Sequence, residues 1–388
     1  MEIIISLLLL LSLALIFAGI AERLRIPEVV ANILAGMVLG PMVLGIVSYS
    51  SVLSGIAEVS LFFIMLLVGI ESTTELLTKH IRSAALFTLS GFIIPVALMA
   101  IIGIAAFGLN AGQSIITSIA IGVPSISIIS VLVMKYGLLE KEDGARVFSS
   151  VVLTDVIAFV ALAAVGNSVT SVLEVVGMLA LIIVMLLGLD LVIRRRAKAV
   201  RRYISGLIAQ EHGEDIIFGG MILIGLLGSA ILEFVGITYV LGAFFVGLLI
   251  HPPVVGDRIY GIMKRTFGRI NNSFFIPIFF SVAGLEATMP ANGLLLLLIT
   301  MLVISGVVGG ILNYLVGMKK AKTIGPITAV ALLGGRGAVG IIIADIALTE
   351  GIITPGLYSV IVFGTVILSL ALPALLSKTE TVLSKAKE

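Results

Sequence analysis

The sequence predicts an all-α integral membrane protein with 13 transmembrane helices. Of its 388 residues, 60% are hydrophobic and only 12% are charged, and the mean hydropathy is +1.27. A soluble domain is about half apolar and a quarter charged, so this excess of apolar residues requires a lipid environment. Two further observations support the prediction: basic residues occupy alternate connections between apolar stretches, and an internal repeat runs along the chain.

Each predicted helix is an apolar stretch suited to a hydrocarbon layer about 30 Å thick. Backbone N–H and C=O groups find no partners in lipid, so these stretches are expected to be helical. The predicted spans are residues 2–20, 28–46, 53–71, 83–106, 113–134, 146–165, 171–193, 215–234, 237–251, 273–287, 293–317, 325–348 and 356–376.

Lysine and arginine follow the odd-numbered spans. All of the 24 basic residues except Arg336 lie in those connections, at their edge (Arg146) or in the C-terminal tail, and the connections after even-numbered spans contain none. By the positive-inside rule, the basic side is cytoplasmic. The N-terminus is therefore predicted to lie outside the cell membrane and the C-terminus inside. Arg336 stands alone within span 12.

An internal repeat relates the two halves of the chain. Residues Ile26–Pro41 align without gaps on Ile237–Pro252, seven spans later. Shorter matches follow in the same order: Gly69-Ile70-Glu71 with Gly284-Leu285-Glu286, and Gly122 with Gly334. Seven is odd, so the two copies cross the membrane in opposite directions. Spans 1–6 and 8–13 are thus predicted to be inverted repeats, an architecture typical of secondary transporters.

The chain is accordingly interpreted as one transmembrane domain, residues 1–388. Residues 1–166 form the first repeat, 171–202 hold the linking span and its basic connection, and 214–376 form the second repeat. Residues 377–388 are predicted to be a cytoplasmic tail.

One carboxylate stands out as a candidate site. Asp155 lies near the middle of span 6, where an ionisable group costs roughly 3 kcal/mol to insert. Thr154 precedes it, and Ser150 lies about one turn earlier. The alternative is a structural carboxylate held by an arginine. Glu71 and Asp345, nearer to span ends, are secondary candidates.

Spans 5 and 12 are predicted to be discontinuous and to cross near the membrane midplane. In span 5, Pro124 removes a backbone donor and Gly122 weakens the helix. The freed carbonyls, with Ser125 and Ser127, are candidate ligands for a cation, although a purely structural kink is an alternative reading. Span 12 contains LLGGRGAVG, in which Arg336 is expected to compensate exposed helix ends and nearby carboxylates rather than to bind substrate.

Oxygen ligands of this kind suit hard cations. A buried carboxylate also binds a proton, because desolvation disfavours its charged form. A group that holds either a proton or a cation is a minimal coupling device. Cysteine is absent and the three histidines lie near segment ends, so no thiolate or histidine metal site is expected. We find no nucleophile–base pair or phosphate loop, and predict neither an enzyme nor a cofactor nor a nucleic-acid partner.

These features resemble the monovalent cation/proton antiporter superfamily, closest to the transmembrane domain of its Kef-type and sodium/proton antiporter branch. The resemblance covers essentially the whole chain. Its motifs are RLRIPEVVANILAGMVLGP, LFFIMLLVGIES, the Thr154-Asp155 pair, ITYVLGAFFVGLLI, FFIPIFFSVAGLEA and GGRGAVG. It implies a homodimer scaffolded by spans 1–3 and 8–10, Asp155 as the ion- and proton-binding carboxylate, and elevator-like alternating access.

Three positions depart from the family pattern. Electrogenic relatives carry a second acid where this chain has Thr154, and a lysine where it has Asn313. Many relatives carry glutamate where it has Ala338. One obvious titrating group remains, so the resemblance implies electroneutral exchange of H⁺ for Na⁺ or K⁺.

Two other functions compete with this interpretation. The first is a sodium-coupled or independent carrier of an organic anion on a similar inverted-repeat fold, in which Arg336 binds the anion; the buried Asp155 opposes it. The second is a channel, or a membrane-embedded sensor that does not transport. Single-channel currents would indicate the channel, and ion binding without flux would indicate the sensor.

Overall fold

The computed structural model of the protein describes residues 2–24, 28–71, 81–124, 142–166, 212–234, 239–250, 252–316 and 338–385, with isolated positions between 188 and 206. The described residues form helices joined by short turns and contain no β-strand. The predicted all-helical class is therefore confirmed. A helix satisfies its own backbone hydrogen bonds, as a chain in lipid must.

Several helices are interrupted by short π-helical turns, labelled η. The helices up to residue 166 are α1 (Glu2–Leu24), α2 (Glu28–Leu39), α3 (Ser51–Glu71), α5 (Ile81–Thr88), η1 (Leu89–Ile93), α6 (Ile94–Phe107), α7 (Ala111–Gly122) and α9 (Glu142–Gly166). The later ones are α12 (Gly213–Phe234), α13 (Tyr239–Leu249), α14 (Pro252–Val255), α15 (Asp257–Ile270), η2 (Asn271–Phe275), α16 (Ile276–Glu286), α17 (Asn292–Leu302), η3 (Val303–Val308), α18 (Gly309–Val316), α20 (Ala338–Thr349) and α21 (Pro355–Lys385).

Within the described residues, five helical stretches are long and apolar enough to cross a membrane. They are Ile3–Leu24, Ser51–Glu71, Ala85–Phe107, Gly213–Phe234 and Gly293–Leu312. Shorter apolar helices accompany them, including α2, α7, α13 and part of α21. The predicted span 171–193 falls almost entirely outside the described residues, as do parts of spans 5 and 12, so the number of spans stays a prediction.

Three helices begin or end away from the predicted span boundaries. α2 ends at Leu39 rather than near residue 46, because Gly40 and Pro41 follow and the chain turns through Gly45 at φ 63°. Span 10 is continuous with α15 and η2, so its helix begins at Asp257 rather than near 273. α21 continues to Lys385, through most of the predicted tail. Apolar composition located these spans, but it does not mark helix ends built from polar or turn-forming residues.

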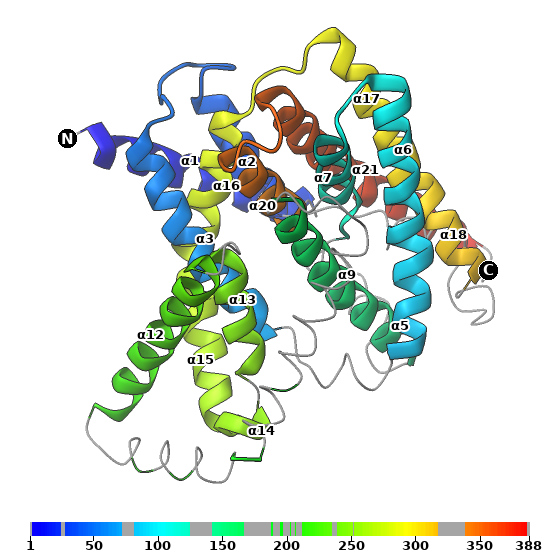
Figure 1. Cartoon of the computed structure of the whole chain (residues 1–388). Helices are drawn as coiled ribbons and strands as arrows, with labels where there is room; N and C mark the ends of the chain where they lie inside the picture. The colour runs from blue at the N-terminus through cyan, green and yellow to red at the C-terminus, as the bar shows by residue number, and fades with distance from the viewer. Residues whose placement is uncertain are drawn as a thin grey trace. The chain divides into compact units, whose positions relative to one another are not determined.

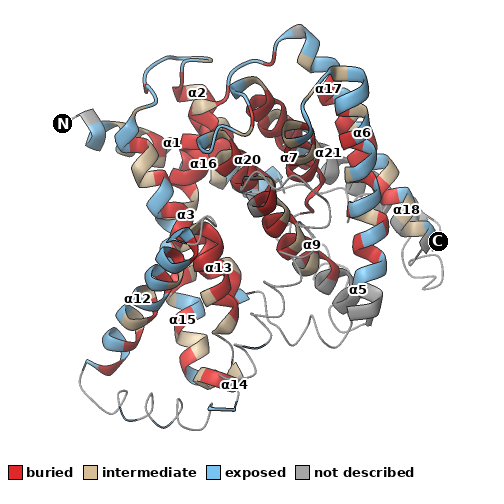
Figure 2. Ribbon diagram, in the orientation of Figure 1, coloured by how far each residue is buried: buried red, intermediate tan, exposed pale blue. Residues whose placement is uncertain are grey.

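The chain divides into two compact units. Unit 1 consists of Met1–Ser54, Leu76–Leu162 and Phe280–Glu388, and unit 2 consists of Gly55–Glu75 and Ala163–Phe279. In unit 1, α1 packs on α2, α6 packs on α7, and α20 packs on both α7 and α21 (Figure 1). Figure 2 shows that α7 and α20 are buried over most of their length. These two helices are therefore the interior of unit 1.

Unit 2 is built around aromatic side chains. α12 packs along α13, with α15 beside them (Figure 1). The Phe63 ring stacks on Phe275 with centroids 4.4 Å apart, and Phe218 stacks on Phe267 at 4.5 Å. One face of α12 is exposed and carries large apolar side chains such as Leu223 and Leu227, as expected of a surface that faces lipid (Figure 2).

Unit 1 contains a close helix crossing between α2 and α16. A Cβ atom added to Gly36 would collide with the backbone oxygen of Ser281, and one added to Gly284 would collide with that of Ile33. Small residues let helix backbones approach this closely, and they are enriched where helices meet in membranes. Glycine is therefore required at both positions.

Unit 2 contains a second crossing of the same kind, between α3 and α13. A Cβ added to Gly247 would collide with the oxygen of Leu66, and one added to Gly69 with that of Phe244. Gly247 and Phe244 are the partners of Gly36 and Ile33 in the aligned segments, each 211 residues later. Ser281 and Gly284 likewise follow Leu66 and Gly69 by 215 residues. The two crossings thus use matching positions throughout.

Candidate functional site

Asp155 is held in the interior of unit 1 by α9. It lies near the middle of the helix, Glu142–Gly166, and its side chain is 0% exposed. Neither carboxylate oxygen has a hydrogen-bond partner among the described residues. Burying a charged carboxylate is costly unless a proton, an ion or a charged residue balances it.

Three hydroxyl groups form a cluster between α5 and α9, and one of them belongs to Thr154, the residue before Asp155. Thr154 Oγ1 donates to the backbone oxygen of Ser150 at 2.8 Å, one helical turn earlier in α9. Thr88, the last residue of α5, donates to the same oxygen at 3.1 Å and lies 3.3 Å from Ser150 Oγ. Thr154 Oγ1 is 3.4 Å from Thr88 Oγ1. All three residues are buried.

The sequence analysis identified Thr154 and Ser150 but missed Thr88. Thr88 belongs to a different span, and nothing in the order of residues shows that the two helices meet. The signal available was a hydroxyl residue inside an apolar stretch, which is common in membrane helices and therefore weak.

Helix α7 stops where the sequence predicts an interruption. Its last residue is Gly122, and Val123 follows in an extended conformation, φ −66° and ψ 122°. Pro124 has no N–H with which to continue the helix. The carbonyl of Ile121 is instead bound by the Ser305 hydroxyl at 3.0 Å, from the π-helical turn η3. The arrangement leaves a helix end inside unit 1, with a partial negative charge.

Helix α20, the described part of span 12, packs closely on α7. A Cβ added to Gly340 would collide with the backbone oxygen of Ala120. Asp345 is half-buried in α20 and takes part in at least one interaction. The two helices predicted to be discontinuous are thus neighbours over their described parts.

The other predicted site residues do not join this cluster within the described structure. Glu71 belongs to unit 2, where its exposed carboxylate lies 3.6 Å from Lys264 Nζ. The Tyr260 hydroxyl donates to the backbone oxygen of Ile70, next to Glu71, at 2.9 Å. Asn313 is part of α18, but its side chain lies outside the described residues, as do Ser125, Ser127 and Arg336.

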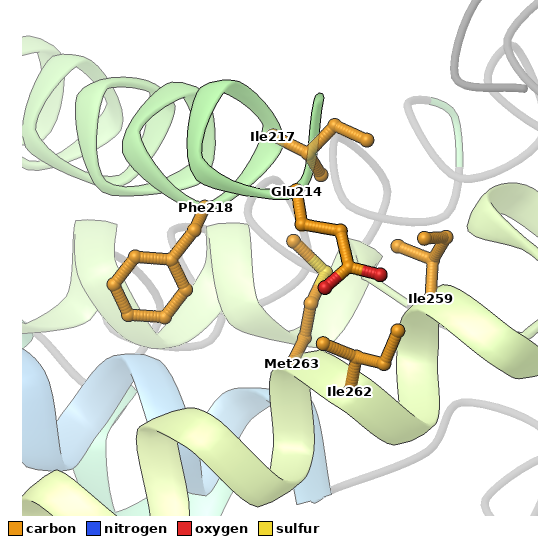
Figure 3. Close-up of a pocket in the computed structure, with 6 residues that line it drawn as sticks. All are labelled: Glu214, Ile217, Phe218, Ile259, Ile262 and Met263. Carbon is orange, nitrogen blue, oxygen red and sulfur yellow. The ribbon is translucent and has the colours of Figure 1, made fainter. Parts of the chain in front are cut away.

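A small recess between α12 and α15 in unit 2 does not have the chemistry of an ion site. It is lined by Glu214 and by apolar side chains: Ile217, Phe218, Ile259, Ile262 and Met263 (Figure 3). The Glu214 carboxylate lies 3.7 Å from Arg258 and is largely exposed. Its charge is therefore paired and solvated.

No group of three His, Cys, Asp or Glu side chains in the described part of the chain is placed to hold a metal ion. Among the buried oxygens of α9 and of its contact with α5 are those of the Asp155 carboxylate and of the Thr88, Ser150 and Thr154 hydroxyls. Such ligands suit a hard monovalent cation better than a transition metal.

A helical membrane protein that buries a carboxylate with no partner among its described residues, and in which a helix ends in the interior, belongs to the class that includes the secondary transporters. The chain is a member of the sodium/hydrogen exchanger family, because the sequence model of that family's transmembrane region matches residues 8–378. The predicted resemblance is thus confirmed.

Relatives of known name cover almost the whole chain. The Na⁺/H⁺ antiporter of Enterococcus hirae is 24% identical over 378 residues, which are 97% of each chain. The Na⁺/H⁺-K⁺ antiporter GerN of Bacillus cereus is 22% identical and covers 93% of this chain and 92% of its own. The solved structure of the sodium proton antiporter MjNhaP1 from Methanocaldococcus jannaschii matches with a TM-score of 0.68 at 19% identity, covering 96% of this chain and 97% of that one. This last likeness shows a shared fold.

Proposed function

We propose that the protein is an antiporter that exchanges protons for a monovalent cation, Na⁺ or K⁺, across the cell membrane. The observation that carries the proposal is Asp155, wholly buried and without a hydrogen-bond partner among the described residues. The names of the relatives, Na⁺/H⁺ and Na⁺/H⁺-K⁺ antiporters, support the choice of substrates.

Asp155 couples the two fluxes by binding one ion at a time. With a proton it is neutral and tolerates burial; with a cation its charge is balanced and the hydroxyl oxygens of Thr154 and Ser150 supply further ligands. A charged carboxylate with neither ion bound is the costly state. This cost prevents the empty site from moving across the membrane, so each proton is exchanged for a cation. Ser125 and Ser127 are proposed as additional ligands, and Arg336 as the residue that compensates helix ends and carboxylates.

The exchange is proposed to be electroneutral, one proton for one cation. Thr154 occupies the position of the second acid found in electrogenic relatives, so the α9 site holds one titrating group. Asp345 and Glu71 are the next carboxylates to test.

Alternating access is proposed to follow from an inverted repeat. The matching glycine crossings, α2 with α16 and α3 with α13, support the repeat because equivalent residues make equivalent contacts. We further propose an elevator-like movement in a homodimer, with 13 spans, the N-terminus outside and the C-terminus in the cytoplasm.

The orientation is tested by cysteine labelling with an impermeant reagent. Cysteines at Ser50 and Asn167 are expected to react from outside, and cysteines at Lys198 and Lys320 from inside. If Ser50 and Lys198 label from the same face, the topology of 13 spans is wrong.

The function is tested by cation-driven proton movement in proteoliposomes, with Na⁺, K⁺ and Li⁺ compared at several pH values. Asp155→Asn is expected to reduce exchange to the level of empty liposomes, because an amide releases no proton. Asp257→Asn removes an exposed carboxylate at the start of α15 and is the matched control, expected to exchange normally. Undiminished exchange in Asp155→Asn, or uptake of an organic acid independent of cations, contradicts the proposal.

A further inference from the structure

Thr88 uses its hydroxyl group in an unusual way for a helical threonine. Inside a helix, a Ser or Thr hydroxyl commonly bonds the carbonyl four residues earlier. Thr154, Thr300 and Ser60 all do so, at 2.7 to 2.8 Å. Thr88 instead reaches another helix and contacts Ser150, 62 residues away in sequence. Its hydroxyl therefore joins α5 to α9 rather than capping a local carbonyl.

The proton count of the cluster shows what this contact does. Each hydroxyl has one proton to donate and two lone pairs that accept. The Thr154 hydroxyl donates its proton to the Ser150 carbonyl, the shortest of these contacts at 2.8 Å, and Thr88 donates to the same carbonyl at 3.1 Å. The Ser150 hydroxyl is then free to donate to Thr88 Oγ1, 3.3 Å away. In this arrangement the Thr154 oxygen keeps lone pairs with which to bind a cation.

The place of Thr88 in its helix supports a role in the site. It is the last residue before the π-helical turn η1, and such turns occur frequently at functional sites. The residue is 1% exposed, and the Ser150 and Thr154 side chains it meets are 4% and 1% exposed. The hydrogen bonds are therefore shielded from solvent, and removing the Thr88 hydroxyl leaves the cluster short of a partner.

We infer that Thr88 is a positioning residue of the transport site, which fixes the Ser150 and Thr154 hydroxyls on α9, the helix that carries Asp155, and thereby sets the affinity and preference for the cation. The inference rests on the proposed function, because it assumes that Asp155 binds the transported ion. Thr88 acts through its neighbours and is not itself a ligand.

The test compares three variants by cation-driven proton movement in proteoliposomes. Thr88→Val keeps the shape and removes the hydroxyl, while Thr88→Ser keeps the hydroxyl. Thr365→Val is the matched control, because Thr365 is also buried but its hydroxyl has no partner among the described residues. The KM for Na⁺, K⁺ and Li⁺, the pH profile and the unfolding temperature are measured for each.

Thr88→Val is expected to raise the KM for the preferred cation by about tenfold, the effect of one good hydrogen bond, and to change the ratio among the three cations. Thr88→Ser is expected to remain within about twofold of the wild type, and Thr365→Val to be unchanged. If Thr88→Val does not fold, Thr88→Ala serves in its place and the same shift is expected.

An unchanged KM, cation ratio and pH profile in a folded Thr88→Val or Thr88→Ala protein overturns the inference. So does a variant that lowers only the unfolding temperature, which shows a purely structural contact. The failure of the proposed function looks different: wild type then shows no cation/proton exchange, or Asp155→Asn exchanges normally.

Discussion

The two units share a glycine crossing but treat polar groups in opposite ways. In unit 1 the Ser281 hydroxyl crosses from α16 to the Asn32 carbonyl of α2, at 3.0 Å. The matching positions in unit 2 are Leu66 and Ala243, which have no hydrogen-bonding side chain. The same backbone geometry is thus built once with buried polar groups and once without them.

The two units also differ in where they place charged side chains. Unit 1 buries Asp155 with no partner among the described residues, whereas unit 2 keeps Glu71 and Glu214 in exposed pairs with Lys264 and Arg258. Exposed pairs cost little and contribute little, while an unpaired buried carboxylate is costly. The comparison teaches that unit 2 keeps these charges paired at its surface, whereas unit 1 holds a buried carboxylate that no described residue balances, as the proposed ion site requires.

The largest expected effect concerns the shared feature. Gly36→Ala in unit 1 and Gly247→Ala in unit 2 both drive a Cβ into backbone atoms, so each is expected to lower stability by about 3 kcal/mol or more. Thermal unfolding in detergent measures the loss.

The controls for the glycine crossings are Gly19→Ala in α1 and Gly219→Ala in α12. Nothing lies within 4 Å of a Cβ added at either position, so both are expected to unfold at the wild-type temperature. If only one crossing is sensitive to alanine, the two are not equivalent and the support for an inverted repeat is lost.

A smaller effect is expected where the crossings differ. Ser281→Ala deprives the Asn32 carbonyl of its donor and is expected to cost about 1 kcal/mol. Ser229→Ala is the matched control in unit 2, since the buried Ser229 hydroxyl has no partner among the described residues and its removal is expected to be neutral. Thermal unfolding again measures the change in stability. Equal losses of stability in the two variants contradict the difference in polar groups between the two units.

The smallest effect is expected at the exposed pair of unit 2. Lys264→Met is expected to change stability by less than about 1 kcal/mol, because both side chains are nearly half exposed and water screens their attraction. Exchange is expected to continue in Glu71→Gln. Loss of exchange in that variant breaks the comparison, because Glu71 then belongs to the transport site.

The sequence located those features that depend on composition and on one helix at a time. Apolar stretches predicted the helices, and the position of Asp155 within its span singled it out. The aligned glycines predicted matching helices in the two halves of the chain. A glycine at a fixed position indicates that another backbone packs closely there, even when the sequence does not show which one.

Features that depend on which helices meet were missed. Thr88 reaches α9 from another span, and Ser305 binds the end of α7 from a third, so neither role is visible in local sequence. The π-helical turns η1, η2 and η3 were not predicted either. A π-helical turn inserts one extra residue into a helix, and a membrane helix that is apolar on all sides has no regular hydrophobic pattern in which that insertion would be visible. The end of α2 depends on Gly40 and Pro41, which stop the helix although the apolar stretch continues beyond them.

The central claim is that Asp155 holds a proton or a cation but not both, and proton release on cation binding tests it most directly. Purified protein in weakly buffered solution is titrated with Na⁺ or K⁺ while the pH is followed. Wild type is expected to release protons as cation binds, approaching about one per bound ion at acidic pH, and to bind cation more weakly as the pH falls. Asp155→Asn is expected to release none. Cation binding by the wild type without proton release, or equal release by Asp155→Asn, would contradict the account.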